Sequence, residues 1–219
     1  MPERPLLTGL FGEGVLTRLA PISEQVEDLH PEEWRAVAHT VPARQREFAT
    51  GRRLAHELIR EIGVPDVPLV PREDRVPCWP DGIVGSISHS ADHCAVAVAR
   101  SDSWKSLAVD VEPHLPLEPE LWDLICTPAE RSWLSRAPDR WRGSLARVIF
   151  SAKESVYKAI YPMLRRMLEF HDVQLELQVS FAEREGRFTA ALPHGASVPG
   201  ALQWSEDLIV TSCWVEGVG

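Results

Sequence analysis

The sequence predicts an α+β fold of two similar halves, each with a helix packed on a small, mainly antiparallel sheet. Two observations favour this fold. Each half contains a helical segment followed by strand-like segments, and EFATGRRLAHELI loosely echoes IFSAKESVYKAIY in its order of aromatic, basic and apolar positions. We therefore expect an N-terminal half at 1–113 and a C-terminal half at 114–219. A ligand cleft is expected between them, since ligands tend to bind between domains.

The N-terminal half begins with about forty residues of short apolar runs broken by prolines, which indicate a loop-rich entry. Apolar residues at helical spacing then predict a helix from Ala43 to Gly63, ended by that glycine and by Pro65. A proline-rich connector, VPDVPLVPREDRVPCWPDG, follows and cannot form a helix or a central strand. Two strands are expected after it: VGSISHS leads into Cys94–Ala99, and the second covers Leu107–Pro113.

In the C-terminal half, Thr127 with Pro128 at the first helical position predicts a short helix. The segment FSAKESVYKAIYP places Ser151 three residues before Glu154, which is a capping box and predicts a helix that starts there after a strand. The tail segments VQLELQVSF, RFTAAL and LIVTSCWV alternate as antiparallel strands do.

The overall composition is that of an ordinary globular protein, with 44% hydrophobic residues. A net charge of −9 gives no support to a nucleic-acid partner. The four cysteines are far apart, without the spacing of a zinc site, so we expect reduced thiols. No segment has the character of a signal peptide or a membrane span. We expect a cytoplasmic monomer with no membrane and no nucleic-acid partner.

Two carboxylates, Asp110 and Glu112, lie two residues apart on the second expected strand, so both point to one face. An isolated pair of this kind is most simply the solvated face of an edge strand. Apolar residues precede Asp110, however, and two carboxylates that lose hydration together need a cation or protons. Mg²⁺ prefers such oxygen ligands. The pair fits a magnesium site if Glu154 joins it.

The other polar candidates each have an ordinary structural explanation. Glu154 can serve as a capping residue or pair with Lys158, a contact worth only a few tenths of a kcal/mol. His89 lies among serines in SISHS and can simply be hydrogen-bonded. Arg44 and Arg52, eight residues apart, would share a helix face and suit phosphate, yet surface arginines are common. Arg75 in the connector is a further candidate.

The order of these motifs resembles the 4′-phosphopantetheinyl transferases, in particular their larger pseudo-dimeric class, which activates siderophore and polyketide synthases. The pattern aromatic-Ser-x-Lys-Glu-(Ser/Ala)-x-x-Lys is complete from Phe150 to Lys158. The acidic motif is matched at Val109, Asp110 and Glu112, with Ala108 where the family commonly has glycine. The motifs span roughly residues 44–163, about half of the chain, and the resemblance supports the two-halved fold.

The resemblance implies that coenzyme A donates its phosphopantetheine arm to a serine of an apo acyl or peptidyl carrier protein, leaving 3′,5′-ADP. By position, Asp110, Glu112 and Glu154 would hold Mg²⁺, with Mn²⁺ as an alternative. Glu154, directly or through a metal-bound water, would be the catalytic base. Lys158 and Lys153 would contact the diphosphate. The remaining coenzyme A contacts would be Arg44, Arg52 and His89 at the 3′-phosphate and Arg75 at the adenine.

After this helix the chain mixes apolar and basic residues. They are either an ordinary helix end with favourable cations or a docking patch for acidic carrier proteins, formed by Met163, Leu164, Arg165, Arg166 and Met167. Two further functions remain open: a module that binds coenzyme A or another nucleotide without turnover, and a Mg²⁺-dependent phosphohydrolase. A pure phosphate binder gains nothing from three carboxylates, which repel its ligand.

Overall fold

The computed structural model describes residues 6–90 and 92–217. The strands are β1 (Leu16–Pro21), β2 (Ile83–Ser90), β3 (His93–Arg100), β4 (Trp104–Pro113), β5 (Gln174–Ser180), β6 (Glu185–Ala191), β7 (Ser197–Trp204) and β8 (Leu208–Glu216). The helices are α1 (Pro31–Val37), α2 (Pro42–Ile62), α3 (Trp122–Ile125), α4 (Pro128–Arg136) and α5 (Asp139–Leu164), with 3₁₀ turns at Pro119–Leu121, Phe170–Asp172 and Pro193–Gly195. The predicted α+β class is confirmed.

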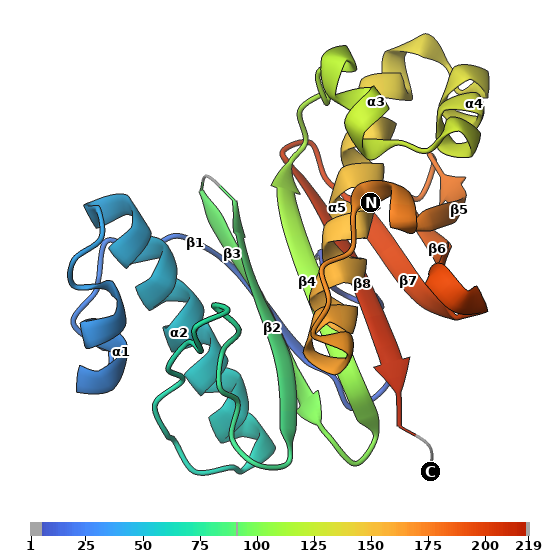
Figure 1. Ribbon diagram of the computed structural model, residues 1–219. Coiled ribbons are helices and arrows are strands. Elements are labelled where there is room, and N and C mark those ends of the chain that lie inside the picture. The colour runs from blue at the N-terminus through green and yellow to red at the C-terminus, as the bar shows by residue number, and fades with distance from the viewer. Residues whose placement is uncertain (1–5, 91, 218–219) are drawn as a thin grey trace.

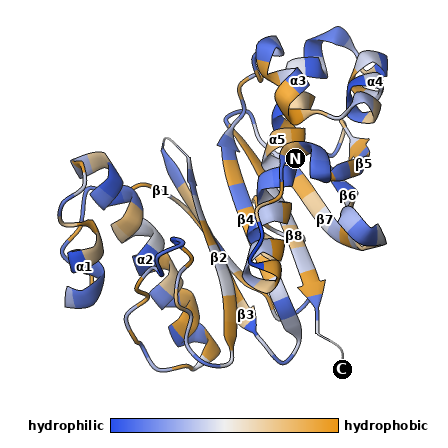
Figure 2. Ribbon diagram, viewed as in Figure 1, coloured by the Kyte–Doolittle hydropathy of each residue, from blue (hydrophilic) through white to orange (hydrophobic). Residues whose placement is uncertain are grey.

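The strands form two antiparallel sheets, one with the order β1-β3-β2 and one with the order β4-β8-β7-β6-β5. Figure 1 shows α2 lying on the smaller sheet and α5 on the larger one. Both helices alternate between hydrophobic and hydrophilic residues along their length, as expected for helices that bury one face (Figure 2). The arrangement of a long helix on an antiparallel sheet therefore occurs twice, as the echo between the two segments predicts.

The two halves meet where β2 runs beside β4 (Figure 1). The Ser86 hydroxyl donates to the carbonyl of Val109, and the Ser88 hydroxyl accepts from the amide of Val111, both at 3.4 Å. Moving two residues forward on β2 also moves the contact two residues forward on β4, so the two strands run parallel. β4 lies within the range 1–113 expected for the first half, but its ladder is with β8 in the larger sheet.

The side chains of β4 alternate between two cores. Ala108 packs in the core beneath α5, whereas Val109 and Val111 pack in a second core on the other side of the strand. Asp110 and Glu112 share the face of Ala108, because residues two apart on a strand point the same way. The strand therefore directs both carboxylates toward α5.

The residues from Phe150 to Lys158, here called the signature segment, lie within α5. The predicted start of their helix at Ser151 is wrong, because α5 begins twelve residues earlier, at Asp139. Gly143 lies within this earlier part and packs tightly: a Cβ added there would be 2.6 Å from Cβ of Pro116. The glycine is thus required by a close approach and does not interrupt the helix. Ser151 is fully buried in mid-helix, so it cannot be a capping residue.

The helices predicted at α2 and α4 are confirmed, with Gly63 in the left-handed conformation at the end of α2 (φ 80°) and Thr127 capping α4. The sequence did not predict β1, α1, β7 or a separate strand β2. β7 contains Pro199 and Gly200, which argue against a strand. Gly200 is needed there, because an added Cβ would be 2.0 Å from the ring of Phe188.

Candidate functional site

Asp110 is the centre of a buried polar cluster between β2, β4 and α5. Its Oδ1 accepts hydrogen bonds from the Ser88 hydroxyl at 2.9 Å and from Nζ of Lys158 at 2.6 Å. Its Oδ2 accepts one from the Ser151 hydroxyl at 2.7 Å, and that hydroxyl also lies 2.9 Å from Oγ1 of Thr211. Asp110 is only 3% exposed, so these contacts fix the orientation of its carboxylate.

Glu112 and Glu154 complete a group of three carboxylates. Burial, reinforced by the charge of Asp110, raises the pKa of Glu112 to about 7, although Arg147 acts in the opposite direction from 3.4 Å. Burial and the charge of Asp110 also raise the pKa of Glu154. Burial and the charge of Asp110 therefore disfavour the ionised forms of Glu112 and Glu154, a cost that a bound divalent cation would offset.

The oxygen atoms of these three carboxylates do not all lie within 4.8 Å of one another, a spacing that only His30, His56 and Asp66 reach among the described residues. Oδ1 of Asp110 is instead paired with the Lys158 ammonium at 2.6 Å. The donor set nevertheless fits Mg²⁺, since three carboxylates supply hard oxygen ligands and leave positions for water and substrate oxygens.

The raised pKa of Glu112 predicts a pH-dependent stability in the metal-free protein. With a folded pKa of about 7 against an ordinary 4.5, the folded protein holds this proton more tightly than the unfolded chain. The stabilising contribution is therefore complete below about pH 4.5 and is lost as the pH rises to about 7. In urea unfolding between pH 5 and 7.5, Glu112→Gln should lose less stability than the wild type, and equal losses would contradict this explanation.

Lys153 does not join the cluster. Its Nζ is 2.8 Å from Oε2 of Glu130 and donates to the carbonyls of Ile125 (2.9 Å) and Phe170 (2.8 Å). The side chain is 1% exposed. Burial lowers the pKa of Lys153, while the hydrogen bond and charge of Glu130 act to raise it. With its donors turned into the core in this conformation, Lys153 is not placed to contact a diphosphate, unlike the role that the resemblance implies.

Arg44 and His89 lie together at the start of α2 and the end of β2, bonded to each other and to Glu47. A guanidinium nitrogen of Arg44 contacts Nε2 of His89, and Oε2 of Glu47 is 3.1 Å from Arg44 and 3.4 Å from Nδ1 of His89. Burial lowers the pKa of His89, with Glu47 opposing and Arg44 adding to the shift. Lys158 and Asp110 also act on this histidine, so the two groups form one continuous polar region.

Arg52 does not share an open helix face with Arg44. It is 4% exposed, its Nε donates to the carbonyl of Leu69 at 2.7 Å, and its guanidinium lies 4.2 Å from the ring centre of Phe48. Burial lowers the pKa of Arg52 to about 10, with Glu33 opposing the shift. In this conformation Arg52 fastens the connector to α2.

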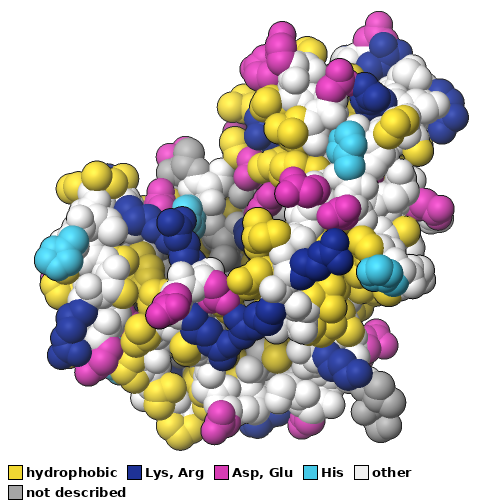
Figure 3. All heavy atoms as spheres, in the orientation of Figure 1, with side chains coloured by type: hydrophobic (Ala, Val, Ile, Leu, Met, Phe, Trp, Pro, Cys, Tyr) yellow, Lys and Arg dark blue, Asp and Glu magenta, His cyan; other side chains and the backbone are white. Residues whose placement is uncertain are grey.

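A cavity of about 530 Å³ opens between the two halves. It is lined by the connector, the start of β2, the start of β4 and the last turns of α5, with the cations Arg72, Arg75, Lys105, Lys158 and Arg165. Figure 3 shows Lys and Arg side chains from both halves on this face of the molecule, interleaved with acidic ones. The predicted cleft therefore exists, with Lys158 at its wall. Arg75 is exposed at a left-handed turn of the connector (φ 67°).

The expected docking patch is exposed at the end of α5. Met163, Leu164 and Met167 are 45%, 54% and 65% exposed. Arg165 ends the helix in the left-handed conformation and forms an ion pair with Asp74 of the connector. The patch therefore adjoins the cavity rim.

Sequence reasoning missed the residues that hold the site residues in place. Ser88 and Ser151 orient Asp110, and Thr211 contacts the Ser151 hydroxyl. Glu47 pairs with Arg44 and His89, and Glu130 holds Lys153. Helical spacing was a usable signal for Ser151, because Glu154 and Lys158 lie three and seven residues further on the same face. The contacts of Ser88, Thr211 and Glu130 depend on tertiary structure and had no local signal. In the described part of the chain, no helix has the length and apolar character needed to cross a bilayer.

Comparison with known proteins agrees with this geometry. The family model for the 4′-phosphopantetheinyl transferase N-terminal domain matches residues 32–99, and that for the 4′-phosphopantetheinyl transferase superfamily matches residues 106–198. Their boundary falls in the turn between β3 and β4, where the two sheets also divide.

Several curated proteins are similar over most of the chain. The 4′-phosphopantetheinyl transferase Svp of Streptomyces mobaraensis is 40% identical over 184 residues, which are 82% of this chain and 70% of Svp. The 4′-phosphopantetheinyl transferase PptT of Mycobacterium tuberculosis is 36% identical, over 74% of this chain and 71% of PptT. Enterobactin synthase component D of Escherichia coli is 35% identical, over 80% and 79% respectively. With both halves matched, this chain belongs to the 4′-phosphopantetheinyl transferase superfamily of enzymes.

Proposed function

We propose that this enzyme transfers the 4′-phosphopantetheine arm of coenzyme A to a serine of an apo carrier protein, releases 3′,5′-ADP and depends on Mg²⁺. The observation that carries the proposal is the convergence of Asp110, Glu112 and Glu154 with Lys158 where the two halves meet. A binding module has no use for such a costly group of acids, whereas transfer from a diphosphate requires charge neutralisation.

The chain's own residues supply most of what this transfer needs. Asp110, Glu112 and Glu154 would hold the magnesium, which when bound supplies a Lewis acid that offsets the charge of the diphosphate. Lys158 would move from Asp110 to a diphosphate oxygen, a short shift for a side chain that lines the cavity. The serines on Asp110 keep that carboxylate oriented, and the buried setting limits competition from water.

Glu154 is proposed as the base that accepts the proton of the attacking serine. Burial and the charge of Asp110 raise the pKa of Glu154, which makes its carboxylate a stronger base. Glu154 lies one helical turn before Lys158, so the base and the cation face the same region. Proton removal and stabilisation of the leaving group can therefore occur side by side.

Coenzyme A is proposed to bind across both halves. Arg44 and His89 would hold its 3′-phosphate beside the acidic cluster, with the guanidinium of Arg44 released from Nε2 of His89 to donate to the phosphate. Arg75 at the cavity wall would lie on the adenine side. Arg52 would act by positioning Leu69 and the connector. One chain supplies both halves of the site, so we propose a monomer. We also propose a cytoplasmic location, because the four cysteines are free thiols.

Intact mass spectrometry on a panel of apo carrier proteins tests the function. Each carrier would be incubated with the enzyme, coenzyme A and Mg²⁺, and in parallel with EDTA or with Mn²⁺. We expect a mass gain of one phosphopantetheine that EDTA abolishes. The carrier that reacts would identify the substrate class, and apo domains of siderophore assembly belong in the panel because enterobactin synthase components are among the relatives.

The other outcomes separate the competing functions. Coenzyme A bound in calorimetry without modification of any carrier would favour a binding module. Cleavage of coenzyme A in the absence of a carrier would favour a phosphohydrolase.

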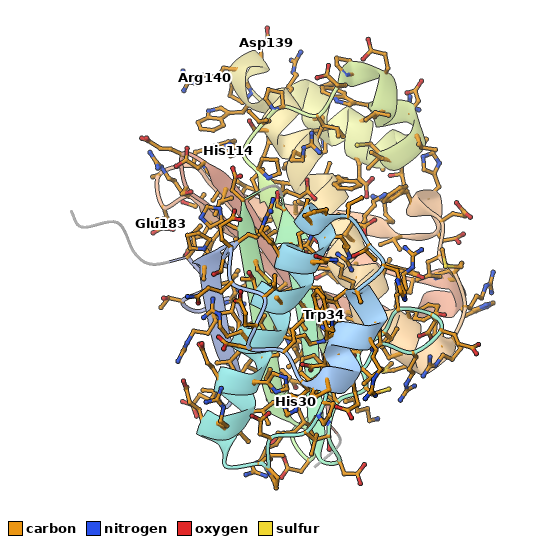
Figure 4. The ribbon with its side chains drawn as sticks, turned by 90° about the vertical axis from the view of Figure 1, so that its left-hand side faces the viewer. His30, Trp34, His114, Asp139, Arg140 and Glu183 are labelled. Carbon is orange, nitrogen blue, oxygen red and sulfur yellow. The ribbon has the colours of Figure 1, made fainter. Side chains whose placement is uncertain are left out.

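The docking patch gives a prediction about carrier recognition. Arg166 is exposed beside apolar side chains, so reversal of its charge in Arg166→Glu should repel an acidic carrier. We expect the KM for the carrier to rise roughly tenfold and the affinity for coenzyme A to stay unchanged. Arg140→Glu, exposed at the far end of α5 (Figure 4), is the matched control and should change neither value. Equal losses for both substrates in Arg166→Glu would contradict a docking role.

A further inference from the structure

Three potential metal ligands converge in the N-terminal half, away from the carboxylate cluster. Oδ1 of Asp66, at the start of the connector, lies 2.6 Å from Nδ1 of His56 on α2 and 3.4 Å from Nε2 of His30. The three ligating atoms all lie within 4.8 Å of one another. His30 immediately precedes α1, as Figure 4 shows. Three separate segments of the chain thus bring a ligand to one point.

The buried carboxylate of Glu33 fixes the orientation of His56 through Nε2, the ring nitrogen that does not face Asp66. Oε1 of Glu33 lies 2.9 Å from Nε2 of His56 and also accepts the amide of Leu69 at 2.7 Å. Oε2 of Glu33 accepts the amide of His30 at 3.1 Å. Since this carboxylate acts as an acceptor throughout, Nε2 of His56 is the donor. A histidine held by a carboxylate on one nitrogen is the usual arrangement behind a metal-bound histidine.

The other nitrogen of His56 is left unsatisfied. His56 is 4% exposed, and within the described residues its Nδ1 has no hydrogen-bond partner. Asp66 is close enough in distance, but its oxygen lies off the line along which an N–H would point. With the proton on Nε2, the lone pair of Nδ1 and a carboxylate oxygen face the same small space. Two acceptors so close together need either a proton on Nδ1 or a cation between or beside them.

We propose that His30, His56 and Asp66 bind a divalent transition-metal ion, with zinc the best match to two imidazoles and one carboxylate. Zinc bonds of about 2.0–2.2 Å in a tetrahedron place ligand atoms about 3.3–3.6 Å apart. The pair His30 and Asp66 already has this spacing. Asp66 needs to retreat from His56 by less than about 1 Å, which its 39% exposed side chain can do. A water would complete the tetrahedron at this open edge.

A simple ion pair is the competing explanation. Arg60 approaches the other oxygen of Asp66, with Nε 3.9 Å from Oδ2, and a doubly protonated His56 could lie between two acids. Arg60 leaves Oδ1 free toward both imidazoles, however, so it does not block a metal.

The bound ion would hold α1 and the connector against α2. The connector continues through Leu69 to Arg75 at the cavity, so the site would stabilise one wall of that cavity.

The test is calorimetric titration of metal-free protein with zinc chloride, in excess Mg²⁺ to occupy the carboxylate cluster. Bound zinc would be counted by elemental analysis, and the melting temperature measured with and without it. We expect one equivalent in the wild type and a higher melting temperature. His30→Ala and Asp66→Asn alter partly exposed ligands and should each weaken zinc binding at least about tenfold. His39→Ala, exposed in the same region, is the control and should bind normally.

Substitution with cobalt identifies the ligands independently. Nitrogen and oxygen ligands predict weak visible bands, whereas a site built from cysteine would show intense thiolate charge transfer in the near ultraviolet. The proposal is overturned if the wild type takes up no zinc, if His30→Ala and Asp66→Asn bind it as the wild type does, or if the cobalt spectrum is that of a thiolate. Retained folding of both variants would be established by circular dichroism.

Discussion

Replacing Glu154 with glutamine is expected to lower kcat by at least about 100-fold, the usual contribution of a general base. The same change should leave the metal-free protein as stable as the wild type or more stable. Burial and the charge of Asp110 raise the pKa of Glu154, so its ionised form is held at a cost in the fold. A neutral amide of the same shape removes that repulsion. Single-turnover kinetics and thermal unfolding of one preparation measure both effects.

The matched control is Glu176→Gln, an exposed carboxylate on β5 far from the cluster in sequence and structure. It should change neither kcat nor the melting temperature. Normal turnover by Glu154→Gln would exclude Glu154 as base and as metal ligand. Loss of activity together with a large loss of stability would instead mean that Glu154 is a structural residue. The combination of lower activity and undiminished stability is the signature of an acid retained for function.

Much of the fold could be read from local signals. α2 has regular apolar spacing and a glycine stop, α4 has its threonine cap, and the strands with clean alternation were found. β7 was missed because Pro199 and Gly200 resemble a turn, although Gly200 serves to admit the ring of Phe188 from the neighbouring strand. That requirement is set by a packing contact between strands, so no rule about local sequence could supply it.

The early start of α5 was within reach of the sequence. Leu145, Val148 and Ile149 continue, toward the N-terminus, the apolar face that Ala152 and Val156 form in the signature segment. Because Ser151 was interpreted as part of a capping box, the helix was predicted to begin there, and its apolar face before Ser151 was overlooked. Its hydroxyl bonds instead to the Asp110 carboxylate, a contact between residues 41 positions apart. The Ser151–Glu154 spacing therefore fits both a helix cap and a contact with a distant residue. Only the apolar periodicity before Ser151 distinguishes the two explanations.

The site was predictable to the extent that its residues share a secondary-structure face. Asp110 and Glu112 follow from strand alternation, and Glu154 and Lys158 from helical spacing. Assigning both Lys153 and Lys158 to the diphosphate shows what is lost when a motif is interpreted without helix geometry. Lys153 and Lys158 are five residues apart, which turns them by about 140° on a helix, so they cannot both face one ligand. The core neighbours of Lys153 at helical spacing, Val156 and Ile160, already indicated a buried position.

Replacing Lys153 with methionine is therefore expected to damage the fold. The change would leave the carboxylate of Glu130 and the carbonyls of Ile125 and Phe170 without their shared cation in a site that is at most 1% exposed. Removing one partner of such a buried pair typically costs about 3–5 kcal/mol of the free energy of unfolding. Urea unfolding at neutral pH measures this loss. Any variant protein that remains folded should bind coenzyme A with nearly the wild-type affinity in calorimetry.

Lys158→Met provides the opposite case on the same helix. Lys158 is 30% exposed and shares Asp110 with two serine hydroxyls, so its loss should change stability much less. It should weaken coenzyme A binding and slow transfer, because the diphosphate loses its proposed cation. The opposite result would be an unchanged free energy of unfolding and weak coenzyme A binding in Lys153→Met. Lys153 would then have to leave Glu130 and contact the ligand, and its pairing with Glu130 would belong only to the ligand-free enzyme. The comparison thus separates, within five residues of one motif, the lysine that holds the helix in place from the lysine that faces the substrate.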